Sequence, residues 1–477
     1  MMLQVFNSLF KSLHAKNIIF CNWKDNHAVA DHLNGIGDLD LYVPISQKVQ
    51  FEDIAKKEGF RRVLSYQASH SYIEHYYGLD KENSIFVHIH VYFKIITGEH
   101  VSKNYDLPLE RYLASNIETS SELPTLNSSA QRSIFLIRYF LKIGSVYGLT
   151  QYFRELEKYS KEWNYIAHDF NYESIPELEI SIEELKKLNQ VYESSTFIKK
   201  FYSSIKFKKK LKRFKRRDFV KYQTFIINNF IVRLLNKFFL KKQKILIPGT
   251  LVAVCGLDGS GKSSLVSSLQ ANFSSHFCTK VFHLGRPSSN LVTFFFNFFI
   301  SVYSFLKRLK FLTKKSHTGV SSKNVSLIYA LRSVLLAYDR KILSKQAFDY
   351  SRKGYLVICD RYPGLENGKM DSPRIPANKS RGALYQYCYS LEQKLYRSIQ
   401  HAKFIFQLSV PLEVAIQRNA LRTKFGKETE AEIKDRFAVN SGVKFLGENY
   451  HIIDATPSSE KVYNRVVDEL WHSEDWG

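Results

Sequence analysis

The pattern of apolar and polar residues divides the 477-residue chain into regions of different character. Up to about residue 118, short apolar runs such as NIIFCNW (17–23), DLDLYV (38–43) and IFVHIHVYF (85–93) alternate with amphipathic stretches. This alternation predicts an α+β domain over 1–118. From 119 to 198, apolar residues recur at helical spacing, as in SAQRSIFLIRYFLKIGSVYG, which predicts a helical extension of that domain.

The C-terminal part has a different pattern, in which nearly continuous apolar runs alternate with helical stretches. LVAVC (251–255), YLVIC (355–359) and KFIFQLSV (403–410) are such runs. Continuous apolar strands are typical of parallel sheets that helices cover on both faces. We therefore predict a doubly wound parallel α/β domain over 247–477, which begins at the Pro-Gly pair of ILIPGT.

Charge adds a fourth region between these domains. The formal net charge of +24 divides into −4 over residues 1–190, +15 over 191–245 and +13 over the remainder. Lysines and arginines interleave with Phe, Leu and Ile over 199–246, and this composition predicts a basic amphipathic connector. LVTFFFNFFISVYSFLKRLKFLTKK (291–315) repeats the combination of apolar and basic residues.

Three interpretations of the basic stretches stay open. Contact with an anionic membrane surface through 199–242 and 291–315 is the first, and solvated or packed helices are the second. Nucleic acid is the least favoured partner, because no nucleic-acid-binding fold signature accompanies the charge. The first residues are amphipathic and interrupted by charge, and the five cysteines lack metal-ligand spacing. We therefore expect a cytoplasmic protein, with the inner face of the membrane as the alternative location and a homodimer left open.

The stretch GLDGSGKSS (256–264) follows a predicted strand and opens a predicted helix, which is the context of a phosphate-binding loop. Its glycines let backbone N–H groups face phosphates, its lysine reaches the β- and γ-phosphates, and its Ser263 hydroxyl ligates Mg²⁺. We therefore expect ATP and Mg²⁺ as cofactors. The predicted nucleotide-binding residues are Gly256, Asp258, Gly259, Ser260, Gly261, Lys262, Ser263 and Ser264.

Five segments in the same order resemble the thymidylate kinase family of P-loop kinases. After the phosphate loop they are HLGRP (283–287), LLAYDRKI (335–342), LVICDRY (356–362) and PLEVAIQRNALR (411–422). The resemblance covers about residues 250–470, and it implies transfer of the γ-phosphoryl group of ATP to a nucleoside monophosphate such as dTMP.

The same resemblance implies roles for individual residues. Asp360 would hold Mg²⁺ through water or orient the nucleophile, while Arg286, Arg340 and Arg361 would bind the acceptor. Arg418 and Arg422 would close over the γ-phosphate, unless they belong to a solvated basic face. The catalytic candidates are Lys262, Asp360, Arg361, Arg418 and Arg422.

Two departures from the family leave the acceptor open. PGLENGKMDSPR (363–374) replaces the segment that reads the thymine base, and HLGRP lacks the acidic residue of the family's Arg-Glu-Pro. The acceptor is therefore dTMP, another nucleotide or a related phosphorylated molecule. A surface-polysaccharide or other membrane-proximal precursor is the alternative, because function follows the site rather than the fold.

A second candidate site lies near the N-terminus, in HLNGIGDLDLYVP. Asp38 and Asp40 fall on one face of a predicted strand, which suits two carboxylates that share Mg²⁺. This segment and the upstream NWK resemble the nucleotidyltransferase superfamily, in the branch fused to thymidylate-kinase-like domains, over about residues 15–100. A surface strand with two exposed aspartates is the structural alternative.

The superfamily's third carboxylate is missing from this chain. The matching strand, VHIHVYF, carries His88 and His90, which ligate metals but supply no negative charge. The domain therefore either transfers nucleotidyl groups with an altered site or binds a nucleotide or partner without turnover. A nucleotide-binding regulator or scaffold is thus a further alternative for the whole protein.

Overall fold

The computed structural model describes most of the chain, in two compact units. The described residues are 2–65, 70–99, 102–144, 146–166, 171–238, 244–285, 287, 293, 295, 298, 326–378, 380–420 and 429–476. We call Met1–Ile247 with Trp471–Glu474 the N-terminal unit, and Pro248–Leu470 with Asp475–Gly477 the C-terminal unit.

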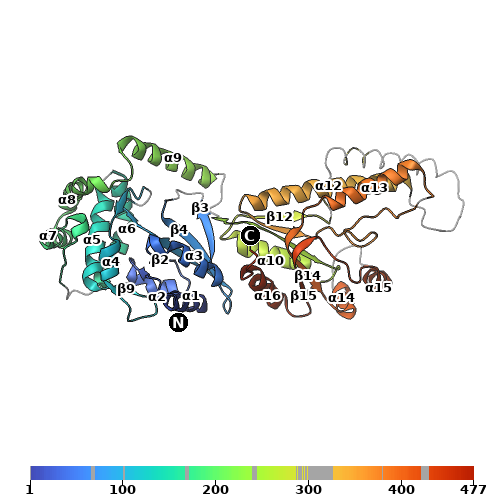
Figure 1. Cartoon of the computed structure of the whole chain (residues 1–477), viewed down its shortest axis with the longest axis horizontal. Helices are drawn as coiled ribbons and strands as arrows, with labels where there is room; N and C mark the ends of the chain where they lie inside the picture. The colour runs from blue at the N-terminus through green and yellow to red at the C-terminus, as the bar shows by residue number, and fades with distance from the viewer. Residues whose placement is uncertain are drawn as a thin grey trace. The chain divides into compact units, whose positions relative to one another are not determined.

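A mixed eight-stranded sheet runs through the N-terminal unit (Figure 1). Its strand order is β10-β3-β4-β5-β2-β1-β9-β8, with β2 parallel to β5 and β4 antiparallel to β5. The strands of this unit, including the small β6–β7 pair, are β1 (Cys21–Asn22), β2 (Asp38–Tyr42), β3 (Arg61–Ser65), β4 (Ile73–Asp80), β5 (Ile85–Tyr92), β6 (Ile95–Thr97), β7 (Tyr105–Leu107), β8 (Ile117–Glu118), β9 (Thr125–Leu126) and β10 (Lys244–Leu246).

Alternation along β2 separates its apolar residues from its carboxylates. Leu39 and Leu41 are fully buried in an apolar cluster that includes Phe6 and Phe51. Because successive side chains of a strand point to opposite faces, the two aspartates of β2 face away from that cluster. The apolar face thereby fixes the direction in which the Asp-x-Asp carboxylates project.

Helices pack around this sheet and extend the unit. Asn127 caps α5 by accepting a hydrogen bond from the Ala130 N–H, and Ser181 and Glu184 form a capping box on α7. The helices of this unit are α1 (Gln4–Ala15), α2 (Val29–Leu33), α3 (Lys48–Lys57), α4 (Glu110–Ser115), α5 (Ser128–Ile143), α6 (Val146–Tyr165), α7 (Ile182–Ser194), α8 (Phe197–Lys210) and α9 (Phe219–Phe238).

The basic stretch 199–246 is part of the N-terminal unit rather than a separate connector. Helix α8 packs against α5, and Phe207 and Leu211 are buried in the same apolar cluster as α5. Strand β10 pairs with β3 at the edge of the sheet. The apolar residues spaced among the lysines give α8 a buried face, and this explains why composition alone predicts a linker where the structure has a packed helix.

The membrane-contact hypothesis concerns residues 199–242 and 291–315. No helix among the described residues is both long enough and apolar enough to cross a bilayer. Most of 291–315 lies outside the described residues. Helix α9 is described, and it exposes apolar side chains that include Ile227, Phe230, Ile231 and Leu234.

The C-terminal unit contains a parallel five-stranded sheet, as the apolar strand pattern predicts. The strand order is β12-β13-β11-β14-β15, and every neighbouring pair is parallel. Helices α12 and α13 lie on one face of this sheet, and α10 and α16 lie on the other (Figure 1). The strands are β11 (Thr250–Gly256), β12 (Thr279–His283), β13 (Leu356–Asp360), β14 (Ala402–Ser409) and β15 (Gly447–Asp454).

This topology sets the place where a ligand would bind. Strand β11 lies between β13 and β14, and all five strands point the same way, so the carboxyl ends of β11 and β13 meet at one edge. In open α/β sheets, ligands bind at that edge. The helices of this unit are α10 (Lys262–Ser274), α12 (Leu327–Arg352), α13 (Ala383–Arg397), α14 (Leu412–Ala420), α15 (Glu430–Val439) and α16 (Ser459–Trp471).

Candidate functional site

The glycine-rich loop connects the end of β11 to the start of α10. Gly256, Gly259 and Gly261 all have positive φ angles, of 137°, 95° and 90°. A Cβ atom at Gly256 would lie 2.5 Å from the carbonyl oxygen of Leu408, so only glycine fits there. No side chain among the described residues caps the first turn of α10. Its N–H groups are therefore oriented as in an anion-binding helix terminus.

Three cations surround the carboxylate of Asp258 inside this loop. Lys262 Nζ donates to the carbonyl of Leu257 at 2.7 Å and lies 3.5 Å from Asp258 Oδ1. The Arg361 guanidinium contacts the same oxygen, and Arg436 Nη1 lies 3.1 Å from Oδ2. Burial alone would raise the pKa of Asp258, but these three charges lower it overall. Asp258 thus gathers at the loop the cations that a phosphate chain requires.

Lys262 is itself perturbed by this environment. Burial, followed by the nearby charge of Arg361, lowers the pKa of Lys262 to about 8. Without a ligand, the charged form of Lys262 is therefore less favoured than the charged form of an exposed lysine. A bound anion at the loop would restore the charged form.

Arg361 reaches the loop from an unusual backbone conformation. Its φ is 68°, in the left-handed region, which costs a non-glycine residue on the order of 1 kcal/mol or more. Its N–H donates to the carbonyl of Val254 at 2.9 Å. A Cβ atom at Gly285 would lie 2.2 Å from Arg361 Cδ, so the glycine of HLGRP leaves the space through which this arginine passes. Its Nη1 also lies 3.3 Å from Asp371 Oδ2.

Arg340, predicted to bind the acceptor, is fully buried in protein contacts. Its guanidinium donates to the carbonyls of Leu284 and Gly285 at 3.0 and 3.1 Å and pairs with Asp371 at 2.9 Å. It also donates to the Tyr396 hydroxyl. The structure therefore places Arg340 behind the site, where it fixes the turn that carries HLGRP and the carboxylate that holds Arg361.

Asp360 ends β13 beside the loop, as the sequence predicts. Its Oδ2 lies 3.1 Å from His283 Nδ1, whereas its Oδ1 is buried with no hydrogen-bond partner among the described residues. Ser263 is exposed in the first turn of α10. A buried carboxylate oxygen without a partner fits a group that binds a hydrated Mg²⁺ ion, and the exposed Ser263 hydroxyl fits a direct ligand.

Two hollows lie near this loop. The larger, of about 880 Å³, includes Arg361 and Arg436 in its wall together with Tyr329 and Asp339. The segment 363–374, whose sequence departs from the thymidylate kinase family, supplies Lys369, Asp371 and Arg374 to the same wall. The five cations of the wall, against its two carboxylates, are Arg332, Arg361, Lys369, Arg374 and Arg436.

The smaller hollow, of about 280 Å³, lies on another side of the loop. Ser260, Gly261 and Ser264 contribute to it, and so does the predicted catalytic residue Arg418. Arg418 Nη2 donates to the backbone carbonyls of Ala455 at 2.8 Å and Thr456 at 3.3 Å rather than to the loop.

Three further arginines bear on this site: two were predicted from the sequence and one was not. Arg286 and Arg422 lie outside the described residues. Sequence reasoning missed Arg436, which α15 carries to Asp258. The available signal was the capping box formed by Thr429 and Glu432, which starts a helix directly after the basic segment and places an arginine about two turns inside it.

The predicted Asp-x-Asp site of the N-terminal unit also forms a local cluster. Strands β2 and β5 pair so that Asp38 lies opposite His88 and Asp40 opposite His90. His88 Nδ1 contacts Asp38 Oδ1 at 2.5 Å, and Lys24 Nζ lies 2.9 Å from Asp40 Oδ2. Burial would raise the pKa of each aspartate, but the histidine and lysine partners lower both, so the carboxylates are ionised.

Two histidines of this cluster, His88 and His75, have pKa values that burial lowers. Burial lowers the pKa of His88 to about 4, although its hydrogen bond with Asp38 opposes the shift. Burial also lowers the pKa of His75, which β4 brings to the same face and which sequence reasoning missed. The signal for His75 was weak, because IEHYYGLD is a short strand with few distinguishing polar positions.

A hollow of about 380 Å³ opens beside Asp38, Asp40 and His90. Burial, followed by the charge of Lys24, lowers the pKa of Lys103 to about 7. Burial and the charge of Arg138 lower the pKa of Lys142 to about 8. The cations in the wall of this hollow are Lys24, Lys103, Arg138, Lys142 and Lys158.

Comparisons with known proteins give distant relatives. No known protein-family profile matches the chain. The uncharacterized ATP-binding protein YghR of Escherichia coli K12 is 26% identical over 227 residues, which are 47% of this chain and 85% of the relative. The uncharacterized ATP-binding protein YghS of the same organism is 25% identical over 224 residues, which are 45% of this chain and 90% of the relative.

Solved structures overlap the chain weakly. A thymidylate kinase from Candida albicans shares 20% sequence identity, over 47% of this chain and 94% of that one, with a TM-score of 0.28. A score this low carries no argument about function.

Proposed function

We propose that the C-terminal unit is an ATP- and Mg²⁺-dependent phosphotransferase of thymidylate-kinase type. The observation that carries this proposal is a phosphate loop that borders one hollow and whose Asp258 contacts Arg361 and Arg436, two residues in the wall of a second, larger hollow. A kinase needs two such spaces, because donor and acceptor must both reach the transferred phosphoryl group. The printed names of YghR and YghS, as ATP-binding proteins, support ATP as the donor.

The loop residues divide the work of holding the donor. The N–H groups of the Gly256–Ser264 loop would bind the phosphates, and Lys262 would neutralise the β- and γ-phosphates. Ser263 and Asp360 would hold Mg²⁺, which when bound neutralises charge on the phosphate oxygens. Ser260, Gly261 and Ser264 face the smaller hollow, which we assign to the nucleoside of ATP.

Arg361 and Arg436 would act on the transferred group. Both contact Asp258 and both form part of the wall of the larger hollow. When a triphosphate enters, its γ-phosphoryl group would replace the Asp258 carboxylate as the partner of these guanidinium groups. They would then stabilise the charge that develops during transfer.

The acceptor carries a phosphate or another anionic group on this proposal. Five cations against two carboxylates in the wall of the 880 Å³ hollow favour such a molecule. The acceptor is dTMP or another nucleoside monophosphate in the first version, with Tyr329 available to stack on a base. In the second version it is a sugar phosphate or a related surface-polysaccharide precursor, because Lys369 and Arg374 replace the family's base-reading segment.

Transfer of labelled γ-phosphate by the purified chain tests both versions. The acceptors are dTMP, the other nucleoside monophosphates and a panel of sugar phosphates, and the variants are Lys262→Ala and the exposed-lysine control Lys345→Ala. Transfer to one acceptor that Lys262→Ala abolishes and Lys345→Ala keeps identifies the substrate. ATP binding with no transfer to any acceptor would instead favour a nucleotide-binding regulator.

We also propose that the N-terminal unit binds a phosphate-bearing ligand in the 380 Å³ hollow. Lys103 and Lys142 are buried there with lowered pKa values, and an anion would restore their charged forms. Nucleotidyl transfer is the catalytic version of this proposal, with Asp38 and Asp40 as metal ligands. Binding without turnover is the version that the histidines opposite these aspartates favour.

Calorimetric titration with inorganic tripolyphosphate separates this hollow from the phosphate loop. We would use Lys262→Ala protein, which weakens the C-terminal site, and add either Lys103→Met or the exposed control Lys11→Met. Of the two double variants, we expect only the one with Lys103→Met to bind tripolyphosphate roughly tenfold more weakly, since one charge-assisted contact is lost. Equal affinities of the two double variants would contradict the proposal.

A further inference from the structure

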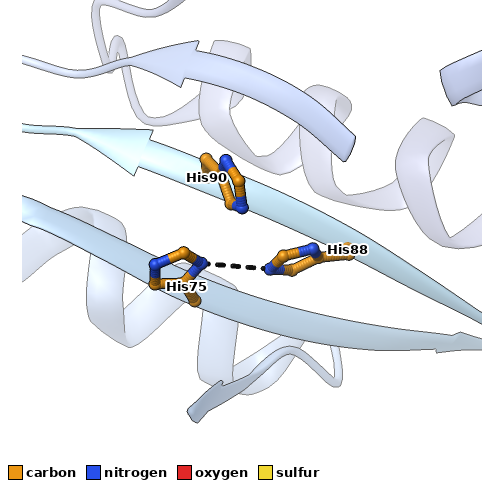
Figure 2. Close-up of side chains that lie close together, drawn as sticks. All are labelled: His75, His88 and His90. Atoms are coloured by element: carbon orange, nitrogen blue, oxygen red, sulfur yellow. Dashed lines mark hydrogen bonds between the residues drawn. The ribbon is translucent and has the colours of Figure 1, made fainter. Parts of the chain in front are cut away.

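Three histidines of the N-terminal unit gather on one face of the sheet. His75 on β4 lies directly opposite His90 on β5 in the antiparallel pair. His88 precedes His90 by two residues on β5 and therefore points to the same face. Figure 2 shows the three imidazole rings converging between the two strands. Neither the phosphotransferase proposal nor the anion-binding proposal uses this arrangement.

The distances match those of a metal chelate. His75 Nδ1 and His88 Nε2 are 3.2 Å apart, and one nitrogen from each of the three rings lies within 4.8 Å of the others. Two nitrogens that bind one tetrahedral zinc ion at about 2.0–2.1 Å are separated by about 3.4 Å. The pair of His75 and His88 is already at that separation, and His90 needs to move by on the order of 1 Å to join it.

Asp38 supplies the outer partner that metal-binding histidines require. His88 Nδ1 lies against Asp38 Oδ1, so this nitrogen donates to the carboxylate and leaves the Nε2 lone pair facing His75. A carboxylate behind a ligating imidazole fixes its tautomer and its orientation. Asp38 Oδ2 and Asp40 Oδ1 lie 3.6 and 3.4 Å from the ring nitrogens of His90.

The type of ligand, together with the charges around the cluster, indicates the class of ion. Asp38 and Asp40 contribute two negative charges, and Lys244 Nζ lies 3.3 Å from the ring nitrogens of His88. Three imidazoles suit zinc and its transition-metal neighbours, whereas Mg²⁺ prefers oxygen ligands. His90 and the two aspartates also border the 380 Å³ hollow, so a fourth ligand of the ion would come from that side.

We propose that His75, His88 and His90 bind a divalent transition metal ion, with Zn²⁺ as the expected ion. The site replaces the oxygen-ligand Mg²⁺ site that the Asp-x-Asp pattern predicts. Asp38 serves as an outer partner rather than a direct ligand. The proposal is independent of phosphoryl transfer, because all of its residues belong to the N-terminal unit.

Cobalt titration of the metal-stripped full chain tests the site. Protein without a polyhistidine tag would be titrated with Co²⁺ in excess Mg²⁺ and without nucleotide, so that oxygen-ligand sites are already filled. We expect one Co²⁺ per chain, a visible d–d band typical of tetrahedral coordination, and displacement of Co²⁺ by one equivalent of Zn²⁺. Absence of stoichiometric binding by the wild-type chain would overturn the proposal and leave a hydrogen-bonded histidine cluster.

Variants locate the ion. His75→Asn and His90→Asn each remove a ligand, and we expect at least ~100-fold weaker Co²⁺ binding, more than the roughly 10- to 100-fold loss typical of an outer partner. Asp38→Asn, on a half-exposed residue, should weaken binding by about 10-fold or more without removing a ligand. His14→Asn is the matched control, since the exposed His14 lies on α1, outside the cluster and the hollow. Equal affinity of His14→Asn and His75→Asn would contradict the assignment even if the wild type binds cobalt.

Discussion

The two units surround their carboxylates with cations in opposite ways. In the C-terminal unit, the carboxylate of Asp258 contacts Lys262, Arg361 and Arg436, and two hollows lie near the loop. In the N-terminal unit, Asp38 and Asp40 are matched by local partners, and other buried cations border the same hollow. The first arrangement holds cations ready for an anion. The second is a set of paired charges in which histidines stand opposite the carboxylates.

The difference shows what a short motif does and does not specify. The phosphate loop is contiguous, so its backbone geometry follows from its own glycines. The Asp-x-Asp pair depends on what β4 and β5 place opposite it, and here those strands supply His75, His88 and His90. Similar carboxylates thereby acquire different expected ligands in the two units.

The largest expected effect compares Asp360, the proposed Mg²⁺-binding carboxylate of the C-terminal unit, with Asp38, the proposed outer partner of the N-terminal metal site. Asp360→Asn should lower kcat/KM for phosphoryl transfer by roughly 10³-fold, because it removes the negative charge that would hold Mg²⁺ beside the phosphates. Asp38→Asn should leave kcat/KM within about twofold, since it alters only the N-terminal unit. Steady-state assays with the acceptor found active provide the measurement. A comparable loss in both variants would mean that the two units share one reaction.

The next comparison sets an arginine found in the structure against one predicted from the sequence. Arg436→Ala should reduce kcat by about 10²-fold, because Arg436 contacts Asp258 where the γ-phosphoryl group would lie. Arg418→Ala should cost about tenfold or less, since its guanidinium binds the carbonyls of Ala455 and Thr456. Single-turnover rates at saturating ATP measure both. The reverse order of effects would restore Arg418 as the residue that closes over the phosphate.

The pH dependence of anion binding should distinguish the units. An anion prefers the protonated lysine, so affinity is full below the pKa of the free protein and falls as pH rises through it. ATP affinity should therefore decline above about pH 8, the pKa of Lys262, and tripolyphosphate affinity of the N-terminal unit above about pH 7, the pKa of Lys103. The slope reaches at most about tenfold per pH unit for one lysine.

Calorimetry in buffers of different ionisation enthalpy measures the proton uptake directly. Lys262→Arg should remove the uptake for ATP near pH 8 while keeping a positive charge at the loop, because arginine stays protonated. If proton uptake on ATP binding persists near pH 8 in Lys262→Arg, the proton binds to a group other than Lys262.

The smallest expected effect concerns the membrane hypothesis. Helix α9 exposes Ile227, Phe230 and Leu234 at helical spacing, within a basic stretch of the chain. We expect a several-fold enrichment on vesicles rich in acidic lipid at low salt, and its loss in an Ile227→Ser, Phe230→Ser variant. Co-sedimentation measures both. Equal recovery with neutral and acidic vesicles would favour the alternative of a solvated helix.

Much of the C-terminal unit was predictable from the sequence. The apolar runs marked β11, β13 and β14, because strands buried on both faces have few polar positions. The phosphate loop, its lysine and the carboxylate that ends β13 followed from local spacing alone. The N-terminal strands β2 and β5 were predictable for a similar reason, since alternation in DLDLY and IFVHIHVY fixes which residues share a face.

Residues that reach the sites from distant parts of the chain were not predictable. Arg436 meets Asp258, 178 residues away in the chain, only because α15 and the phosphate loop come together after folding. His75 joins His88 through strand register, which a short sequence does not reveal. Arg340 illustrates the converse, because its position was predicted but only packing shows that its guanidinium is occupied by Leu284, Gly285 and Asp371.

The sequence by itself determined the parallel sheet, the phosphate loop and the Asp-x-Asp strand, because each depends on interactions between residues close along the chain. The tertiary structure alone decided which charges meet. It turned the basic stretch 199–246 into part of a packed unit, brought Arg436 to Asp258, and placed three histidines beside the two aspartates. Charge pairing and metal geometry depend on distances of a few ångströms between remote segments, and those distances exist only after the chain has folded.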